Sequence, residues 1–63
     1  MTVQEFIDGF DEIAILDICE GGIGHSFFGE EEIECIDEDL LNKPVESSLV
    51  IKKKYGYHVV LEV

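Results

Sequence analysis

The first 42 residues of the chain contain no lysine or arginine, although they contain 13 aspartates and glutamates. The four lysines come later, at Lys43 and in the run Lys52, Lys53 and Lys54, and the 63 residues carry a formal net charge of -11 at pH 7. Binding to DNA, RNA or an anionic membrane requires a cationic surface. The charge distribution therefore argues against nucleic acid or a membrane as a direct partner. It favours a basic protein surface, a polyamine or a metal cation.

Long apolar runs are also absent. No stretch approaches the roughly 20 apolar residues of a membrane-spanning helix. The N-terminal MTVQEFID lacks the basic and then apolar pattern of a signal peptide. We therefore expect a cytoplasmic protein.

Cysteine is scarce, since Cys19 and Cys35 are the only two. Their spacing to each other and to His25 and His58 matches no zinc pattern such as paired CxxC. Free cysteines of cytoplasmic proteins are usually buried, so we expect two buried thiols. A disulfide and a metal site that includes both histidines are the alternatives. We predict no cofactor and no bound metal.

The composition is that of a folded protein, because 46% of the residues are hydrophobic. A length of 63 residues predicts one domain, residues 1–63, near the lower size limit for folding without a disulfide or a metal.

Thr2 and Glu5 have the spacing of a capping box at a helix start. Apolar residues follow at helical spacing, at Val3, Phe6, Ile7 and Phe10. The pattern predicts a short helix that ends near residue 9 or 10, where Gly9 weakens it.

The segment 12–19 predicts a central strand, because both of its faces are largely apolar. One face holds Ile13, Ile15 and Asp17, and the other holds Ala14, Leu16 and Ile18. A turn at Glu20-Gly21-Gly22 joins it to a second strand at 23–28.

We further expect this second strand to continue through Cys35, with Gly29 as a bulge. Ile33 and Cys35 then face inward, and three acids line the outer face: Glu30, Glu32 and Glu34.

The last third of the chain predicts a helical turn at 37–42 and a hairpin of strands 45–53 and 57–63 around Lys54-Tyr55-Gly56. In the final strand, Tyr57, Val59, Leu61 and Val63 form the core face. The order of elements predicts an α+β domain. A short N-terminal helix packs on an antiparallel sheet of about four strands, with one extra helical turn before the C-terminal hairpin.

No catalytic motif is present. The crowded acids lack the two different environments that paired catalytic carboxylates need. GGIGH (21–25) lacks the lysine of a phosphate-binding loop, and Asp37-Glu38-Asp39 lacks the spaced ligands of a calcium loop. A thiol nucleophile, Cys19 or Cys35 with His25 or His58, is a minor alternative. We therefore predict a protein that is not an enzyme.

The acidic run is the strongest functional signal. It concentrates seven carboxylates without a lysine: Glu30, Glu31, Glu32, Glu34, Asp37, Glu38 and Asp39. A solvated surface is the ordinary explanation of such a run. On a strand, however, alternating acids stand about 6.6 to 6.8 Å apart, which is comparable to neighbouring phosphates of a nucleic acid. A fixed row of carboxylates then imitates a phosphate backbone and binds basic grooves built for DNA or RNA.

The chain also resembles small acidic proteins encoded by bacteriophages and other bacterial mobile elements. The likeness lies in TVQEFID, in the step Phe28-Gly29-Glu30, and in DEDLLNKPVES before a final hairpin. Such proteins include anti-CRISPR inhibitors, several of which look like nucleic-acid mimics that block the DNA- or PAM-binding surface of an effector. The resemblance implies a similar origin, size and charge, and hence the cytoplasm of a bacterial host. It implies no particular site residues.

Two hypotheses of different classes follow. The first is a non-enzymatic inhibitor that binds a basic nucleic-acid-binding protein, such as a CRISPR–Cas effector, through the seven acids, with Phe28 and Tyr55 as aromatic anchors. The second is a small structural or assembly domain whose charge serves solubility. Here an edge at 45–53 or 57–63 pairs across a two-fold axis to form a homodimer. Divalent-cation binding at the acidic run is a third, minor hypothesis.

Overall fold

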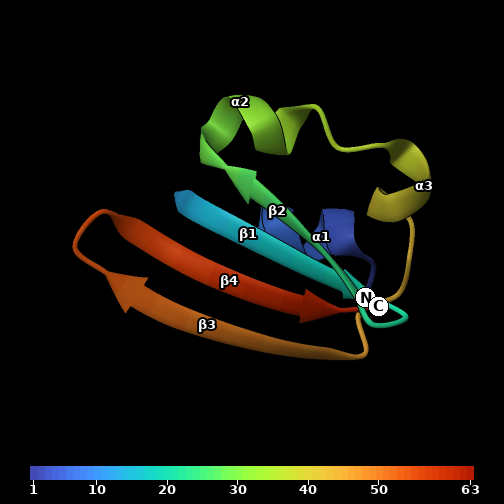
Figure 1. The fold of residues 1–63 in the computed structure, drawn as a ribbon. Helices are drawn as coiled ribbons and strands as arrows, with labels where there is room; N and C mark the ends of the chain where they lie inside the picture. The colour runs from blue at the N-terminus through green and yellow to red at the C-terminus, as the bar shows by residue number, and fades with distance from the viewer.

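The computed structural model describes residues 1–63 and has an α+β fold, as the sequence predicts (Figure 1). Its elements are α1 (Val3–Asp8), β1 (Ile13–Glu20), β2 (Ile23–Phe28), α2 (Gly29–Glu34), α3 (Glu38–Leu41), β3 (Ser47–Lys53) and β4 (Gly56–Glu62). The four strands form one sheet in the order β2-β1-β4-β3. None of the helices is long and apolar enough to cross a membrane.

The sheet is mixed, whereas the sequence predicted an antiparallel one. β1 pairs with β2 and β3 pairs with β4 in antiparallel hairpins, but β1 and β4 run parallel at the centre. Hairpins follow from local turns, while the pairing of the two hairpins with each other depends on tertiary packing. As a consequence β4 is central, and the prediction of 57–63 as a free edge is wrong. Of the two predicted edges, only β3 is an edge strand.

α1 begins as predicted. The Glu5 backbone N–H donates to Thr2 Oγ1 at 3.2 Å, and the Thr2 N–H donates to Glu5 Oε1 at 2.9 Å. These two bonds satisfy donors that the first turn of a helix leaves free. The pKa of Glu5 is lowered, first by the backbone hydrogen bond from Thr2. The helix ends at Asp8, with Gly9 as its C-cap.

The β1–β2 hairpin turns at Gly21 and Gly22, whose φ angles of 56° and 84° are left-handed. Only glycine adopts such angles at no steric cost, and two successive ones match the twist of a two-residue hairpin turn. The turn sets the register, so that Glu20 pairs with Ile23 and Asp17 pairs with Ser26. A register shift between Ile13 and Ile15 turns Ile13 toward the core, whereas the sequence placed it on the same face as Ile15.

The predicted extension of β2 through Cys35 is wrong. Gly29 has a φ of 83°, which ends the strand, and residues 29–34 form helix α2. Glutamate favours a helix over a strand, and acids in the first turn interact favourably with the positive end of the helix dipole. Ile33 packs against the core as predicted, but Cys35 is exposed rather than inward-facing.

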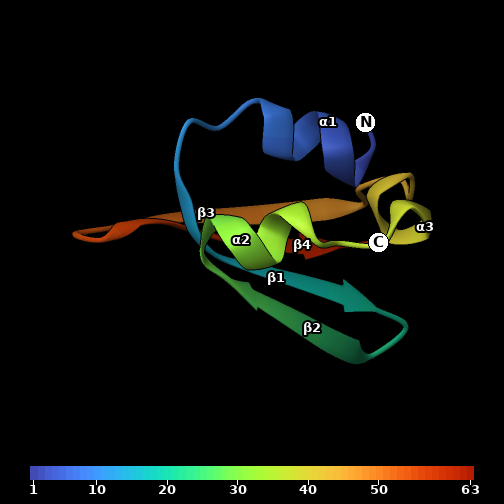
Figure 2. The same ribbon diagram turned by 90° about the horizontal axis from the view of Figure 1, so that it is seen from above.

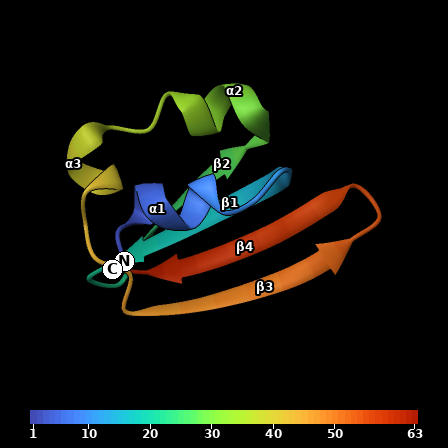
Figure 3. The same ribbon diagram turned by 180° about the vertical axis from the view of Figure 1, so that it is seen from behind.

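The core lies between the helices and one face of the sheet. Six side chains are buried: Val3, Leu16, Ile18, Ile36, Val59 and Leu61. Helical residues such as Phe6, Ile7 and Leu41 pack against them. From behind, α1 lies across the strands with α2 and α3 beside it, and the view from above shows α1 standing off one side of the sheet (Figures 2 and 3). The other face of the sheet is left uncovered.

Candidate interaction surfaces

The acidic residues gather in the helical layer. Eleven of the 15 lie in α1, α2 and α3 or in the short segments 9–12 and 35–37 next to them. The seven acids predicted from the sequence as a binding surface are all exposed: Glu30, Glu31, Glu32, Glu34, Asp37, Glu38 and Asp39. They do not form the predicted row on a strand. Glu30, Glu31, Glu32 and Glu34 project at helical spacing from α2, and the others belong to α3 and its N-cap.

A groove of about 490 Å³ runs between α1 and α2. Its floor is apolar and consists of Ile7, Phe10, Ile13, Ile33 and Leu41. Five carboxylates and one amide complete its lining: Asp8, Asp11, Glu12, Glu30, Glu34 and Gln4. Glu30 and Glu34 are four residues apart and so share one face of α2. We refer to this feature as the acidic groove.

No cation neutralises the acidic groove. The chain has one lysine–carboxylate ion pair, Lys43 with Glu20, and one histidine–carboxylate contact, His58 with Asp17, and neither involves a groove carboxylate. The nearest compensation is the Gln4 side-chain N–H, which donates to Asp8 Oδ1 at 2.8 Å. Like charges at this density repel one another and oppose folding. The groove therefore presents a negative field that a cationic ligand would relieve.

A second hollow, of about 350 Å³, lies between the β1–β2 hairpin and α3. Asp37 and Asp39 line it, together with His25, Cys35 and the Lys43–Glu20 ion pair. The Lys43 Nζ lies 2.6 Å from Glu20 Oε2. The pKa of Lys43 is raised, first by this hydrogen bond and then by the charges of Glu20 and Asp39. Because its own lysine already compensates it, this hollow is a weaker cation site than the acidic groove.

The two predicted aromatic anchors lie in different parts of the molecule. Phe28 is 57% exposed, ends β2 and is the N-cap of α2, while Tyr55, also 57% exposed, lies in the β3–β4 turn. That turn projects away from the helices and carries Lys54, with Lys52 and Lys53 beside it (Figure 1). The structure therefore places Phe28 next to the acids of α2 and separates Tyr55 from them.

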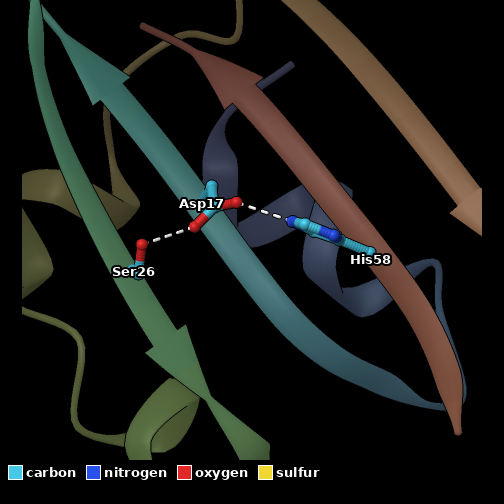
Figure 4. Close-up of polar contacts among 3 residues, drawn as sticks. All are labelled: Asp17, Ser26 and His58. Atoms are coloured by element: carbon cyan, nitrogen blue, oxygen red, sulfur yellow. Dashed lines mark hydrogen bonds and ion pairs between the residues drawn. The ribbon is translucent and has the colours of Figure 1, made fainter.

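The uncovered face of the sheet holds a polar network that the sequence did not reveal (Figure 4). The Ser26 hydroxyl donates to Asp17 Oδ1 at 2.6 Å, and His58 Nε2 lies 2.6 Å from Asp17 Oδ2. The three residues come from β2, β1 and β4, and α1 lies behind them on the other side of the sheet. The pKa of Asp17 is lowered, first by the Ser26 hydrogen bond and then by the bond and charge of His58.

Serine, histidine and aspartate also make up hydrolase triads, but the connectivity here differs. In a triad the histidine lies between the serine and the carboxylate and takes the serine proton. Here Asp17 lies between Ser26 and His58, and each of its oxygens contacts one of them. The serine therefore has no histidine beside it, and its hydroxyl donates to the carboxylate instead. The network joins three neighbouring strands of the sheet.

The cysteines and histidines do not converge. Cys19 is half-buried and Cys35 is exposed, so the prediction of two buried thiols is wrong, and both thiols are free rather than joined in a disulfide. No group of three or more histidine, cysteine or acidic side chains has the geometry of a metal site. Cys19 and His25 lie on opposite faces of the β1–β2 hairpin, since Cys19 pairs with Gly24.

Sequence reasoning missed three of the five groove acids: Asp8, Asp11 and Glu12. They are spread over the end of α1 and the following loop, so they form no run in the sequence. Only the packing of α1 beside α2 brings them near Glu30 and Glu34.

Comparison of the chain with protein-family models, with curated proteins and with solved structures finds no match.

Proposed function

We propose that this protein is a non-catalytic inhibitor whose helical face binds a basic surface of a nucleic-acid-binding protein. The observation that carries the proposal is the acidic groove, where five carboxylates from two distant segments surround an apolar floor without a neutralising cation. In its most specific form the partner is a CRISPR–Cas effector, and the acidic face occupies the channel that receives DNA. The resemblance to phage-encoded inhibitors motivates that form.

The groove suits lysine or arginine side chains better than a bare ion. Both residues bury an apolar stem and keep a charged head in water. A stem that lies on Ile7 and Ile33 brings its head to the rim, where Asp8 and Glu34 lie on opposite sides. Because no metal geometry is present, a divalent cation is a poorer occupant. Complementary charge of this kind accelerates association and makes it dependent on salt.

The acids of α2 do not form a phosphate-like row. The proposed mimicry of nucleic acid therefore rests on the negative electrostatic field of the helical face and on the acidic groove. Carboxylates on one side of α2 line the groove, whereas Glu31 and Glu32 do not. Helix α2 therefore offers an internal control, with two pairs of glutamates of equal charge on one element. Charge reversal of either pair changes the net charge by the same amount.

The test is competition for DNA. Labelled target DNA is bound to guide-loaded CRISPR–Cas effectors, and its displacement is followed by fluorescence anisotropy. The wild-type chain should displace it. Glu30→Lys/Glu34→Lys should lose at least about 100-fold in potency, whereas Glu31→Lys/Glu32→Lys should lose about tenfold. Reversing a charge in direct contact with the partner costs several kcal/mol of binding free energy, and reversing one at the rim of the interface costs less. Circular dichroism verifies that both variants fold.

Each other outcome removes part of the proposal. Equal losses in both variants would mean that total charge matters and the groove does not. Failure of the wild-type chain to displace DNA from any effector tested would reject the anti-CRISPR form. If, in addition, an immobilised wild-type chain retained no nucleic-acid-binding protein from bacterial lysate, the inhibitor function would be rejected as a whole.

A further inference from the structure

The uncovered face of the sheet is more apolar than a solvated face requires. Its strand positions alternate with the buried ones, so Ile15, Phe28, Leu49, Ile51 and Val60 all lie on it. Phe28 and Leu49 are each 57% exposed. A sheet that faces water usually carries polar residues on its outer side, and contiguous apolar patches mark interaction sites. We propose that this open face binds a second copy of the same chain, so that two sheets stack in a homodimer.

Charge favours a second copy on this face. Eleven of the 15 acids belong to the helical layer and its loops, so two copies that met through their helices would bring carboxylates together. The open face holds Asp17, Glu62 and Lys53, and Asp17 is already paired with His58. It is therefore the side on which a chain of charge -11 approaches its own copy with the least repulsion.

The polar network does not oppose burial. Each carboxylate oxygen of Asp17 already has a partner, from Ser26 on one side and His58 on the other. A covered polar group is costly mainly when it loses water and gains no hydrogen bond. The network runs diagonally across the centre of the face, with Phe28 and Ile15 on one side and Val60 and Leu49 on the other. A two-fold related copy can therefore set one apolar side against the other.

The size of the face limits the affinity. Four strands of six to eight residues, with a rise of about 3.3 Å per residue and a spacing of about 4.8 Å, present an area of about 20 by 20 Å. Side chains make each face rougher than a flat plane, so two such faces bury on the order of 1,000 Å² of accessible surface in total. That area is near the lower limit of specific protein–protein interfaces. The dimer should accordingly be of micromolar affinity and should dissociate on dilution.

Two adjacent residues of β3 provide a matched test. Leu49 lies on the open face, whereas Val50, 40% exposed, pairs with Val59 on the helix-covered face. Leu49→Lys and Val50→Lys add the same charge to the same edge strand at exposed positions. Sedimentation velocity from about 1 µM to about 1 mM, a range that brackets micromolar affinity, measures the dissociation constant of each variant. Denaturant melts verify that both variants fold.

Leu49→Lys should weaken dimerisation by at least about 30-fold, because each two-fold interface contains the substitution twice. Val50→Lys should change it by less than about threefold. A wild-type chain that stays monomeric up to about 1 mM would overturn the proposal. Equal weakening by both variants would also overturn it and would indicate pairing of β3 edges instead. Glu30→Lys/Glu34→Lys should dimerise like the wild type, so failure here is distinguishable from failure of the acidic groove.

Discussion

The two faces of the sheet differ in what covers them more than in how apolar they are. On β1, Leu16 and Ile18 are fully buried under the helices, while Ile15 and Asp17 lie on the open face. On β4, Val59 and Leu61 are buried, while His58 and Val60 are on the open side. A chain of this length has enough helix to cover one face only. The helices that bury the core also carry most of the acids, so the open face is left with few charged side chains.

This difference between the faces has a functional consequence. A basic partner bound at the acidic groove and a second copy bound at the open face would contact opposite sides of the sheet and would not compete. In such an assembly two acidic helical faces point outward from a stacked pair of sheets. A dimer would therefore present two copies of the groove to its target, which raises avidity where the target offers two basic sites.

The largest expected difference between the faces concerns stability. Leu16→Ala removes a side chain that is fully buried in the core and should lower the free energy of unfolding by about 3 kcal/mol. Ile15→Ala, one residue away on the open face, should cost about 1 kcal/mol in the monomer, since less of its surface is removed from water. Urea melts at concentrations below the dimer range measure both values. Equal costs for the two variants would mean that the open face is covered in the isolated chain.

Local signals predicted most of the elements on the covered face. The capping box at Thr2, the paired glycines at 21–22 and the alternation in 57–63 each depend on neighbouring residues, and each is confirmed. The parallel pairing of β1 with β4 joins residues about 40 positions apart, and no local pattern encodes it. Helix α2 was missed because alternating glutamates satisfied a strand pattern. The helix propensity of glutamate and the left-handed Gly29 outweighed that pattern.

The functional surfaces show the same limit. The pairing of Asp17 with Ser26 follows from the two-residue turn, because Glu20 opposite Ile23 sets every later pair of the hairpin. The contact of Asp17 with His58 needs the parallel register and is therefore beyond local reasoning. In the same way, Glu30 and Glu34 are visible in the acidic run, but their neighbours Asp8 and Asp11 across the groove depend on how α1 packs.

A smaller effect concerns the charge of Asp17 on the open face. Asp17→Asn preserves the shape of the side chain and should lower the free energy of unfolding by about 1 kcal/mol at pH 7. The folded pKa of Asp17 is lowered, so folding favours the charged form. That contribution is complete above the unfolded value of about 3.9 and is lost as the pH falls through the lower folded value.

The difference in the free energy of unfolding between wild type and Asp17→Asn should therefore shrink as the pH falls from about 5 toward 3. Urea melts of both proteins across that range measure it. A difference that stayed constant with pH would show that the Ser26 and His58 contacts do not depend on the charge of Asp17.

The smallest expected effect tests whether the helical face is strained by its own charge. Glu34 faces Glu30 one turn away on α2 and shares the groove with three other acids, whereas Glu62, at the end of β4, faces Ser47 and Cys19 across the neighbouring strands. Glu34→Gln should raise the free energy of unfolding by a few tenths of a kcal/mol at low salt, because it relieves a repulsive pair. Glu62→Gln should change it less.

Thermal melts at about 0.01 M and about 1 M salt show whether charge repulsion causes the gain in stability. The Debye length falls from about 30 Å to about 3 Å between these concentrations, so screening should remove a gain that comes from repulsion. A gain that persisted at high salt would assign it to helix propensity or packing, and a loss would mean that Glu34 makes a favourable contact and that the groove is not repulsive.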